Sequence, residues 1–219
     1  MIPQNPKKQG KNMQKNSVIA IMQLKIVIKN IFLSIIIGLY STIVLSKTTS
    51  IENVKDGVTY DRLEELAQKR SDFSYRPDWG MFSMSIKNLN TYFLVLGMNG
   101  NDYSNRSWCE AAFFDNNYRY VNKAHINIMD HDDGNSCFYI DGISAVMYRK
   151  QPAMLITVTY RRGEPYRTAN LYNFTALFVL TPHPDGSLSI RQDNSCLGAM
   201  NQIDTLAAAK KRIARCNQK

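Results

Sequence analysis

The segment between Gly80 and Ile190 constrains the fold most, because it repeats one pattern many times. Short runs rich in Tyr, Phe, Val, Ile and Thr alternate with Gly, Asn, Asp and Pro, a composition typical of β-strands separated by turns. Residues 162–165 and 182–186 contain the turn-forming residues of tight links, which favours antiparallel pairing. Residues 171–180 could instead form a short helix, since a continuous apolar run does not reveal its period. The pattern predicts strands over residues 81–87, 91–98, 108–114, 118–128, 136–140, 143–149, 153–160, 170–180 and 187–191.

Helical patterns flank this strand-rich segment. Asp61 and Glu64 have the spacing of a capped start for a helix that continues to about Arg70. A second helix is predicted over residues 201–215, where apolar residues share one stripe and basic residues occupy the final turns. We therefore expect an α+β fold, in which an antiparallel sheet of about seven to nine strands, either open or strongly curved, carries an N-terminal and a C-terminal helix.

Residues 1–46 have the organisation of an export signal peptide. Two lysines supply the positive region, residues 31–45 supply the apolar run, and cleavage is expected near Ser46. The run is shorter than the roughly 20 apolar residues of a membrane-spanning helix. An uncleaved membrane anchor is the alternative. A translation start at Met22 would give a leader of ordinary length.

The remaining residues, 47–219, have the size of a single exported domain. The whole chain has 27 basic and 18 acidic residues, a formal net charge of +9. The leader contains six lysines and no acidic residue, so 21 basic residues face 18 acidic ones in the domain, a net charge of +3. The high isoelectric point is therefore mostly a property of the leader.

The four cysteines all follow the leader, and their even number favours disulfides in an oxidising compartment. Sequential pairing, Cys109 with Cys137 and Cys196 with Cys216, is the interpretation we favour among three possible connectivities. Each pair encloses a plausible local unit. The alternative is four reduced thiols or a metal site, but the spacing of zinc ligands is not present.

Sequence motifs for catalysis, cofactors and metals are missing. The three histidines, His125, His131 and His183, form no ligand pair at helical spacing, and no nucleophile elbow or phosphate-binding loop occurs. The acidic stretch 130–135 has Asn where an EF-hand requires Gly, so we interpret it as a polar hairpin loop. We assign no catalytic, cofactor-binding or metal-ligating residue and expect a protein that binds rather than catalyses.

Residues 160–167 are the best candidate for a recognition loop. They combine Tyr and Arg, which are enriched at binding hot spots, with the Gly and Pro of a turn. A plain hairpin turn is the alternative. The loop favours a periplasmic or secreted inhibitor or immunity-type protein that blocks a protein partner, such as a toxin or hydrolase. The predicted contact residues are Tyr160, Arg161, Arg162, Glu164, Tyr166 and Arg167.

The order of elements resembles that of lipocalin-like folds, with consecutive antiparallel strands followed by a late helix and Cys216. Residues 76–80, Arg-Pro-Asp-Trp-Gly, do not have the Gly-x-Trp order of that family. The resemblance implies a second function class, a carrier that holds a small apolar ligand in a cup-shaped sheet. The basic residues near 161–167 and 210–215 are interpreted as solvated surface, so no nucleic-acid partner is expected. Contact with a membrane is expected only through an uncleaved leader.

Overall fold

The computed structural model describes residues 49–86, 90–99, 107–128, 136–162, 170–199 and 201–218, all within one compact unit, Thr48–Lys219. The predicted leader and its cleavage site lie outside the described residues. No helix in the described part of the chain has the length and apolar character needed to cross a membrane.

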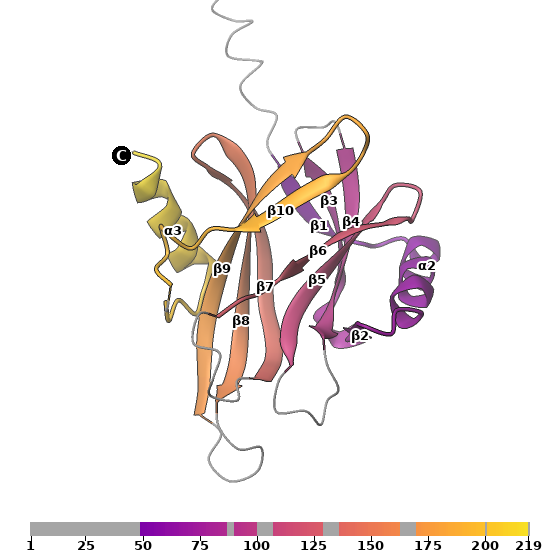
Figure 1. Cartoon of the computed structure of the whole chain (residues 1–219), viewed down its shortest axis with the longest axis horizontal. Helices are drawn as coiled ribbons and strands as arrows, with labels where there is room; N and C mark the ends of the chain where they lie inside the picture. Colours follow the sequence, from indigo (N-terminus) through magenta and orange to yellow (C-terminus); the bar gives the residue numbers. More distant parts are fainter. Residues whose placement is uncertain are drawn as a thin grey trace, which may run out of the picture. The chain divides into compact units, whose positions relative to one another are not determined.

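The described elements are mainly strands, with one α-helix near each end (Figure 1). The helices are α2 (Gly57–Gln68) and α3 (Leu206–Cys216), and a 3-10 turn, η3, covers Pro77–Trp79. The strands are β1 (Ser50–Asn53), β2 (Ser74–Tyr75), β3 (Met81–Ile86), β4 (Asn90–Asn99), β5 (Trp108–Asp115), β6 (Tyr120–His125), β7 (Ser136–Tyr148), β8 (Gln151–Arg162), β9 (Asn170–Pro182) and β10 (Leu188–Gln192).

The strands form two antiparallel sheets, which confirms the predicted α+β class. The six-stranded sheet has the order β1-β3-β4-β5-β6, with β2 added beside β4, and the four-stranded sheet has the order β10-β9-β8-β7. Neither sheet is closed or curled. Most paired strands are consecutive in the chain, as is usual where short links join them.

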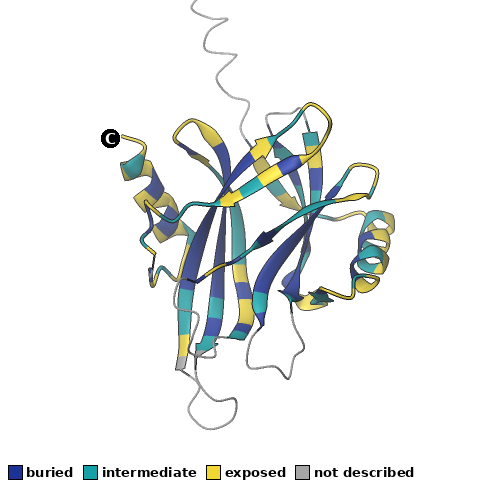
Figure 2. Cartoon of the chain, viewed as in Figure 1, coloured by how far each residue is buried: buried dark blue, intermediate teal, exposed yellow. Residues whose placement is uncertain are grey.

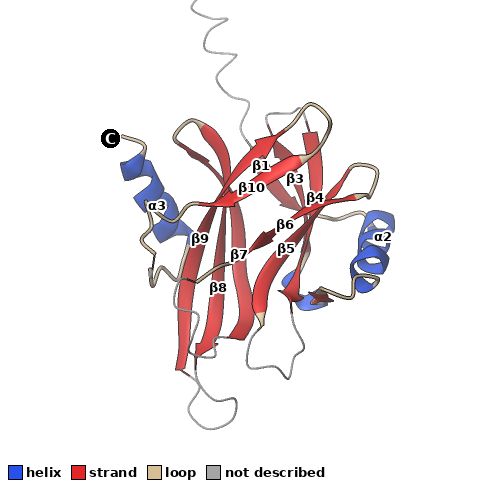
Figure 3. Ribbon diagram, viewed as in Figure 1, coloured by secondary structure: helices blue, strands red, loops and turns tan. Residues whose placement is uncertain are grey.

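One apolar core lies between the two sheets. It includes Leu94 and Phe113 from the six-stranded sheet and Ile156, Phe174 and Phe178 from the four-stranded sheet. Alternate residues on each strand point to the opposite face, as strand geometry requires. The outer face of the six-stranded sheet packs against α2, and that of the four-stranded sheet packs against α3 (Figure 3). The domain therefore has the layers helix, sheet, sheet, helix.

Both predicted disulfides are confirmed. Cys109–Cys137 joins β5 to β7 and so links the two sheets, whereas Cys196–Cys216 ties the end of α3 to the segment after β10. Each bridge closes a loop of 20–28 residues, a span for which the chain-entropy model gives about 3 kcal/mol of stabilisation. Two disulfides indicate an oxidising location outside the cytoplasm.

The two helices begin elsewhere than predicted. The N-cap of α2 is Asp56, five residues ahead of the predicted cap Asp61, and its carboxylate accepts a bond of 2.9 Å from the Thr59 amide. Helix α3 starts after Thr205 rather than at Asn201. Asn201 is buried, and its side-chain amide bonds both the N–H and the C=O of Thr175 on β9. The Asn201 side chain therefore attaches the segment before α3 to β9 instead of capping a helix.

Two points of the strand prediction also need correction. The predicted strands 136–140 and 143–149 are one strand, β7, because the pairing with β8 continues through two irregularities, near Phe138 and near Asp141. The predicted strand 170–180 is confirmed as part of β9, which excludes the alternative of a helix over residues 171–180. The edge strand β1 and the short β2 were not predicted.

Candidate functional site

Tyr160, the first residue of the predicted recognition loop, lies in the core. It is completely buried, and its hydroxyl accepts a bond of 3.2 Å from the Cys109 amide and donates one of 3.2 Å to the Ile126 carbonyl. Burial in this apolar environment raises the pKa of Tyr160 well above its ordinary value. This side chain joins the two sheets and is not accessible to a partner.

Arg161, the next residue, points to the opposite face of β8. Its guanidinium carbon lies 4.8 Å from the centre of the Phe138 ring, within cation–π range. Leu171 is its direct partner on β9. Phe138 is 46% exposed and Leu171 is 53% exposed. We call Phe138, Arg161 and Leu171 the Phe138 patch; it lies on strand ends that extend past α3 (Figure 2).

The other predicted contact residues are only partly placed. Arg162 is the last residue of β8, and Glu164, Tyr166 and Arg167 lie outside the described residues. The recognition loop itself therefore stays a prediction. Phe138 and Leu171, which the sequence did not single out, are the side chains that the sheet register brings next to Arg161.

A polar layer separates the Phe138 patch from the part of the sheet that α3 covers. The Thr159 hydroxyl lies 2.8 Å from oxygens of Asp141 and Asn173. One step further along the same face, Thr175 is buried, and its hydroxyl donates a bond of 2.8 Å to the Ile203 carbonyl. The segment before α3 thus closes the middle of this outer face, and the patch remains outside that cover.

A cluster of charged side chains, separate from the Phe138 patch, lies on the outer face of the six-stranded sheet. Glu110 is completely buried, and its Oε1 lies 2.7 Å from His125 Nδ1, 3.2 Å from Lys123 Nζ and 3.4 Å from Asn99 Nδ2. The other oxygen, Oε2, is buried with no hydrogen-bond partner among the described residues. The His125 ring lies 5.1 Å from the Trp108 ring. In the sequence, Glu110 lies between Trp108-Cys109 and four apolar residues, a position that indicates a buried acidic side chain. The sequence-based predictions above did not include it.

Lys123 connects this cluster to the surface. Burial opposes its charge, but the Glu110 carboxylate 3.2 Å away and the Asp72 carboxylate 3.5 Å away raise the pKa of Lys123 above its ordinary value. Asp72 also accepts two bonds from Arg70, whose guanidinium covers the Tyr120 ring. The charged side chains of this cluster therefore form ion pairs with one another. In the described part of the chain no three His, Cys, Asp or Glu side chains are placed to hold a metal ion.

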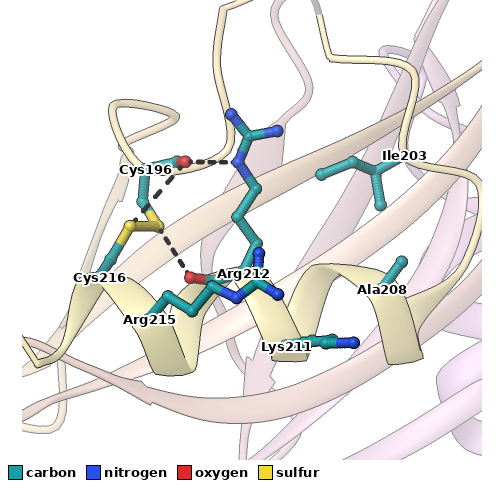
Figure 4. Close-up of a pocket in the computed structure, with 7 residues that line it drawn as sticks. All are labelled: Cys196, Ile203, Ala208, Lys211, Arg212, Arg215 and Cys216. Atoms are coloured by element: carbon teal, nitrogen blue, oxygen red, sulfur yellow. Dashed lines mark hydrogen bonds between the residues drawn. A yellow bond between two sulfur atoms is a disulfide. The ribbon is translucent and has the colours of Figure 1, made fainter.

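A groove of about 630 Å³ runs between α3 and the segment that precedes it (Figure 4). Arg212 Nε donates a bond of 3.1 Å to the Cys196 carbonyl, which brings the guanidinium across the groove. Two more cations come from the same helix, and the remaining surface is apolar or disulfide. The groove is lined by Cys196, Ile203, Ala208, Lys211, Arg212, Arg215 and Cys216.

Comparison of the chain with protein-family models, with curated proteins and with solved structures finds no match.

Proposed function

We propose that this protein is an exported, noncatalytic binder that blocks a protein partner, as an inhibitor or immunity-type protein does. The observation that carries the proposal is the Phe138 patch, in which an aromatic ring and a leucine side chain, each about half exposed, flank an arginine. Arginine and aromatic side chains dominate the binding energy of protein interfaces. The partner is therefore expected to insert an apolar group beside Phe138 and to place an acceptor against Arg161.

The backbone under the patch supports this proposal because it is rigid. Cys137, directly before Phe138, forms the disulfide with Cys109, and its amide donates a bond of 2.8 Å to the Ser107 carbonyl. Tyr160, directly before Arg161, is fixed by its two core hydrogen bonds. A surface that is ordered before binding loses less entropy when the partner arrives. Tight, slowly dissociating binding is the property that an inhibitor needs.

The second predicted class, a carrier for a small apolar ligand, would use space inside the fold. Large aromatic side chains from both sheets occupy the core, among them the fully buried Phe113, Phe174 and Phe178. A filled core favours recognition at the surface over enclosure of a ligand. The proposal therefore gives the binding function to the strand ends.

The test compares the tagged, exported wild-type chain with the double variant F138S/L171S. Both substitutions remove exposed apolar groups, so the variant should fold. The wild type is expected to retain a partner from the extracytoplasmic proteins of the source cells and to inhibit that partner's activity. Loss of two hot-spot side chains should weaken this binding by roughly 30-fold or more.

The matched control is V58S, which removes an apolar side chain that is 78% exposed on α2. It should bind and inhibit as the wild type does. Equal binding by F138S/L171S and the wild type would show that the patch is not the interface. A captured protein that the wild type does not inhibit would remove the inhibitor proposal.

A further inference from the structure

The groove beside α3 combines positive charge with an apolar wall. Lys211 and Arg215 are four residues apart and therefore neighbours on the helix surface. Ile203 and Ala208 line the same groove, as does the Cys196–Cys216 disulfide (Figure 4). A site of this composition suits a ligand with one charged end and one apolar part.

The three cations of the groove have no carboxylate partner among the described residues, whereas six basic residues elsewhere in the domain do. Among the described residues, Arg62, Lys69, Arg70, Arg119, Lys123 and Arg191 each form an ion pair with an acidic side chain. Lys211, Arg212 and Arg215 form none with a described residue. Like charges four residues apart on a helix repel each other, and a bound anion would relieve that repulsion.

Arg212 is held in place before any ligand binds. Its Nε–H is used by the Cys196 carbonyl, and Cys196 is itself fixed to Cys216 at the end of α3. The two terminal nitrogens keep their N–H groups for another acceptor, and a guanidinium presents such groups in the geometry of an oxyanion. A site that attracted anions by charge alone would not require the Arg212 guanidinium to be held in one orientation.

We propose that this groove, which Lys211 and Arg215 also line, binds a small organic anion, with its carboxylate or phosphate group on Arg212 and its apolar part against Ile203 and Ala208. The site is separate from the Phe138 patch and does not depend on the partner-binding proposal. Phenyl phosphate is a suitable probe because it has both parts. Inorganic phosphate has only the charge, and phenol has only the ring.

The experiment is a titration of the full chain, oxidised at both disulfides, followed by NMR of backbone amides. Phenyl phosphate should bind saturably, with shifts centred on Gly198, Ala208 and Arg212, and more tightly than inorganic phosphate. Phenol should cause no such shifts. The variant R212Q should weaken binding by about 10-fold, the loss typical of one charge-assisted hydrogen bond. K211Q should weaken it less, because an ammonium lacks the two-pronged geometry.

The matched control is K210Q, which removes one positive charge from the same helix at a residue that does not line the groove. It should leave the affinity unchanged. Equal losses in K210Q and R212Q would mean nonspecific charge attraction and would overturn the proposal, as would the absence of saturation up to roughly 10 mM probe. Binding to vesicles of anionic lipid without binding of phenyl phosphate would also overturn it. If R212Q unfolds, R212K, which keeps the charge but loses the fixed geometry, replaces it and should also bind more weakly.

Discussion

Glu110 forms an ion pair with Lys123 and is completely buried. The stability of the fold therefore depends on the positive charge of Lys123. The substitution Lys123→Met keeps the length of the side chain and removes its charge. Loss of one partner from a fully buried pair typically costs roughly 3–5 kcal/mol. The Lys123 side chain is 27% exposed, and His125 still contacts the carboxylate at 2.7 Å. We therefore expect a loss of about 2–3 kcal/mol in the free energy of unfolding.

The assay is urea unfolding at pH 8 with both disulfides intact, followed by circular dichroism. The expected loss corresponds to a fall in melting temperature of about 5–10 °C for a domain of this size. The double variant E110M/K123M removes both charges and should recover to within about 1 kcal/mol of the wild type.

Lys69→Met is the control, since it makes the same substitution in an ion pair with Glu65 whose side chains are 64% and 46% exposed. It should cost less than about 1 kcal/mol. A loss in K123M no larger than in K69M would refute the view that the buried charge depends on Lys123. A double variant less stable than K123M would refute it as well, because removal of the second charge should help.

Two further predictions concern packing and alkaline pH. Gly97→Ala should lower the free energy of unfolding by about 1–3 kcal/mol, since the new Cβ would lie 2.5 Å from both the Phe73 ring and the Ser74 carbonyl oxygen. Gly57→Ala is the control, because its Cβ would have no atom within 4 Å, and it should be neutral or slightly stabilising in the same urea assay. The melting temperature should be level from pH 7 to 9 and fall above about pH 10, because the pKa values of Tyr160 and Lys123 are raised in the folded state. Stability from such groups is complete below the unfolded pKa and is lost as the pH rises through the folded one. A Tyr160→Phe variant should show a shallower fall, and an equally steep fall would exclude Tyr160 as a cause.

The sequence predicted most strands within one or two residues because their pattern is local. Runs such as β3 and β5 are rich in apolar residues and end at turn-forming residues, so the sequence marks both limits. The disulfide pairs were predictable for a similar reason, since each joins cysteines that are close along the chain. The edge strand β1, with the sequence Ser-Ile-Glu-Asn, has no such pattern and gains its structure only from pairing with β3.

The division into two sheets and the location of the helix caps depend on distant contacts. Asp56 and Asp61 both precede a helical pattern, but the Thr59 hydroxyl, which binds Asp56, also contacts the Tyr118 hydroxyl across the fold. That contact favours the earlier start. No local pattern reveals such a partner 59 residues away.

The candidate surface was only half predictable. The tyrosine and two arginines at 160–162 suggested a recognition loop, but these residues are the end of strand β8, where neighbours point to opposite faces. Tyr160 therefore enters the core and Arg161 reaches the surface. Phe138 and Leu171 join Arg161 through the register of β7 and β9, which the sequence does not encode in any single segment.

The two disulfides have unequal importance for the two surfaces. Cys109–Cys137 anchors the backbone directly before Phe138, and the Cys109 amide also binds the hydroxyl of Tyr160, directly before Arg161. One bridge thus positions β7 and β8, two of the three strands that carry the Phe138 patch. Cys196–Cys216 instead positions Arg212 and the wall of the groove beside α3. Because each bridge orders a different surface, oxidation outside the cytoplasm stabilises the fold and also orders the two surfaces for which we propose binding.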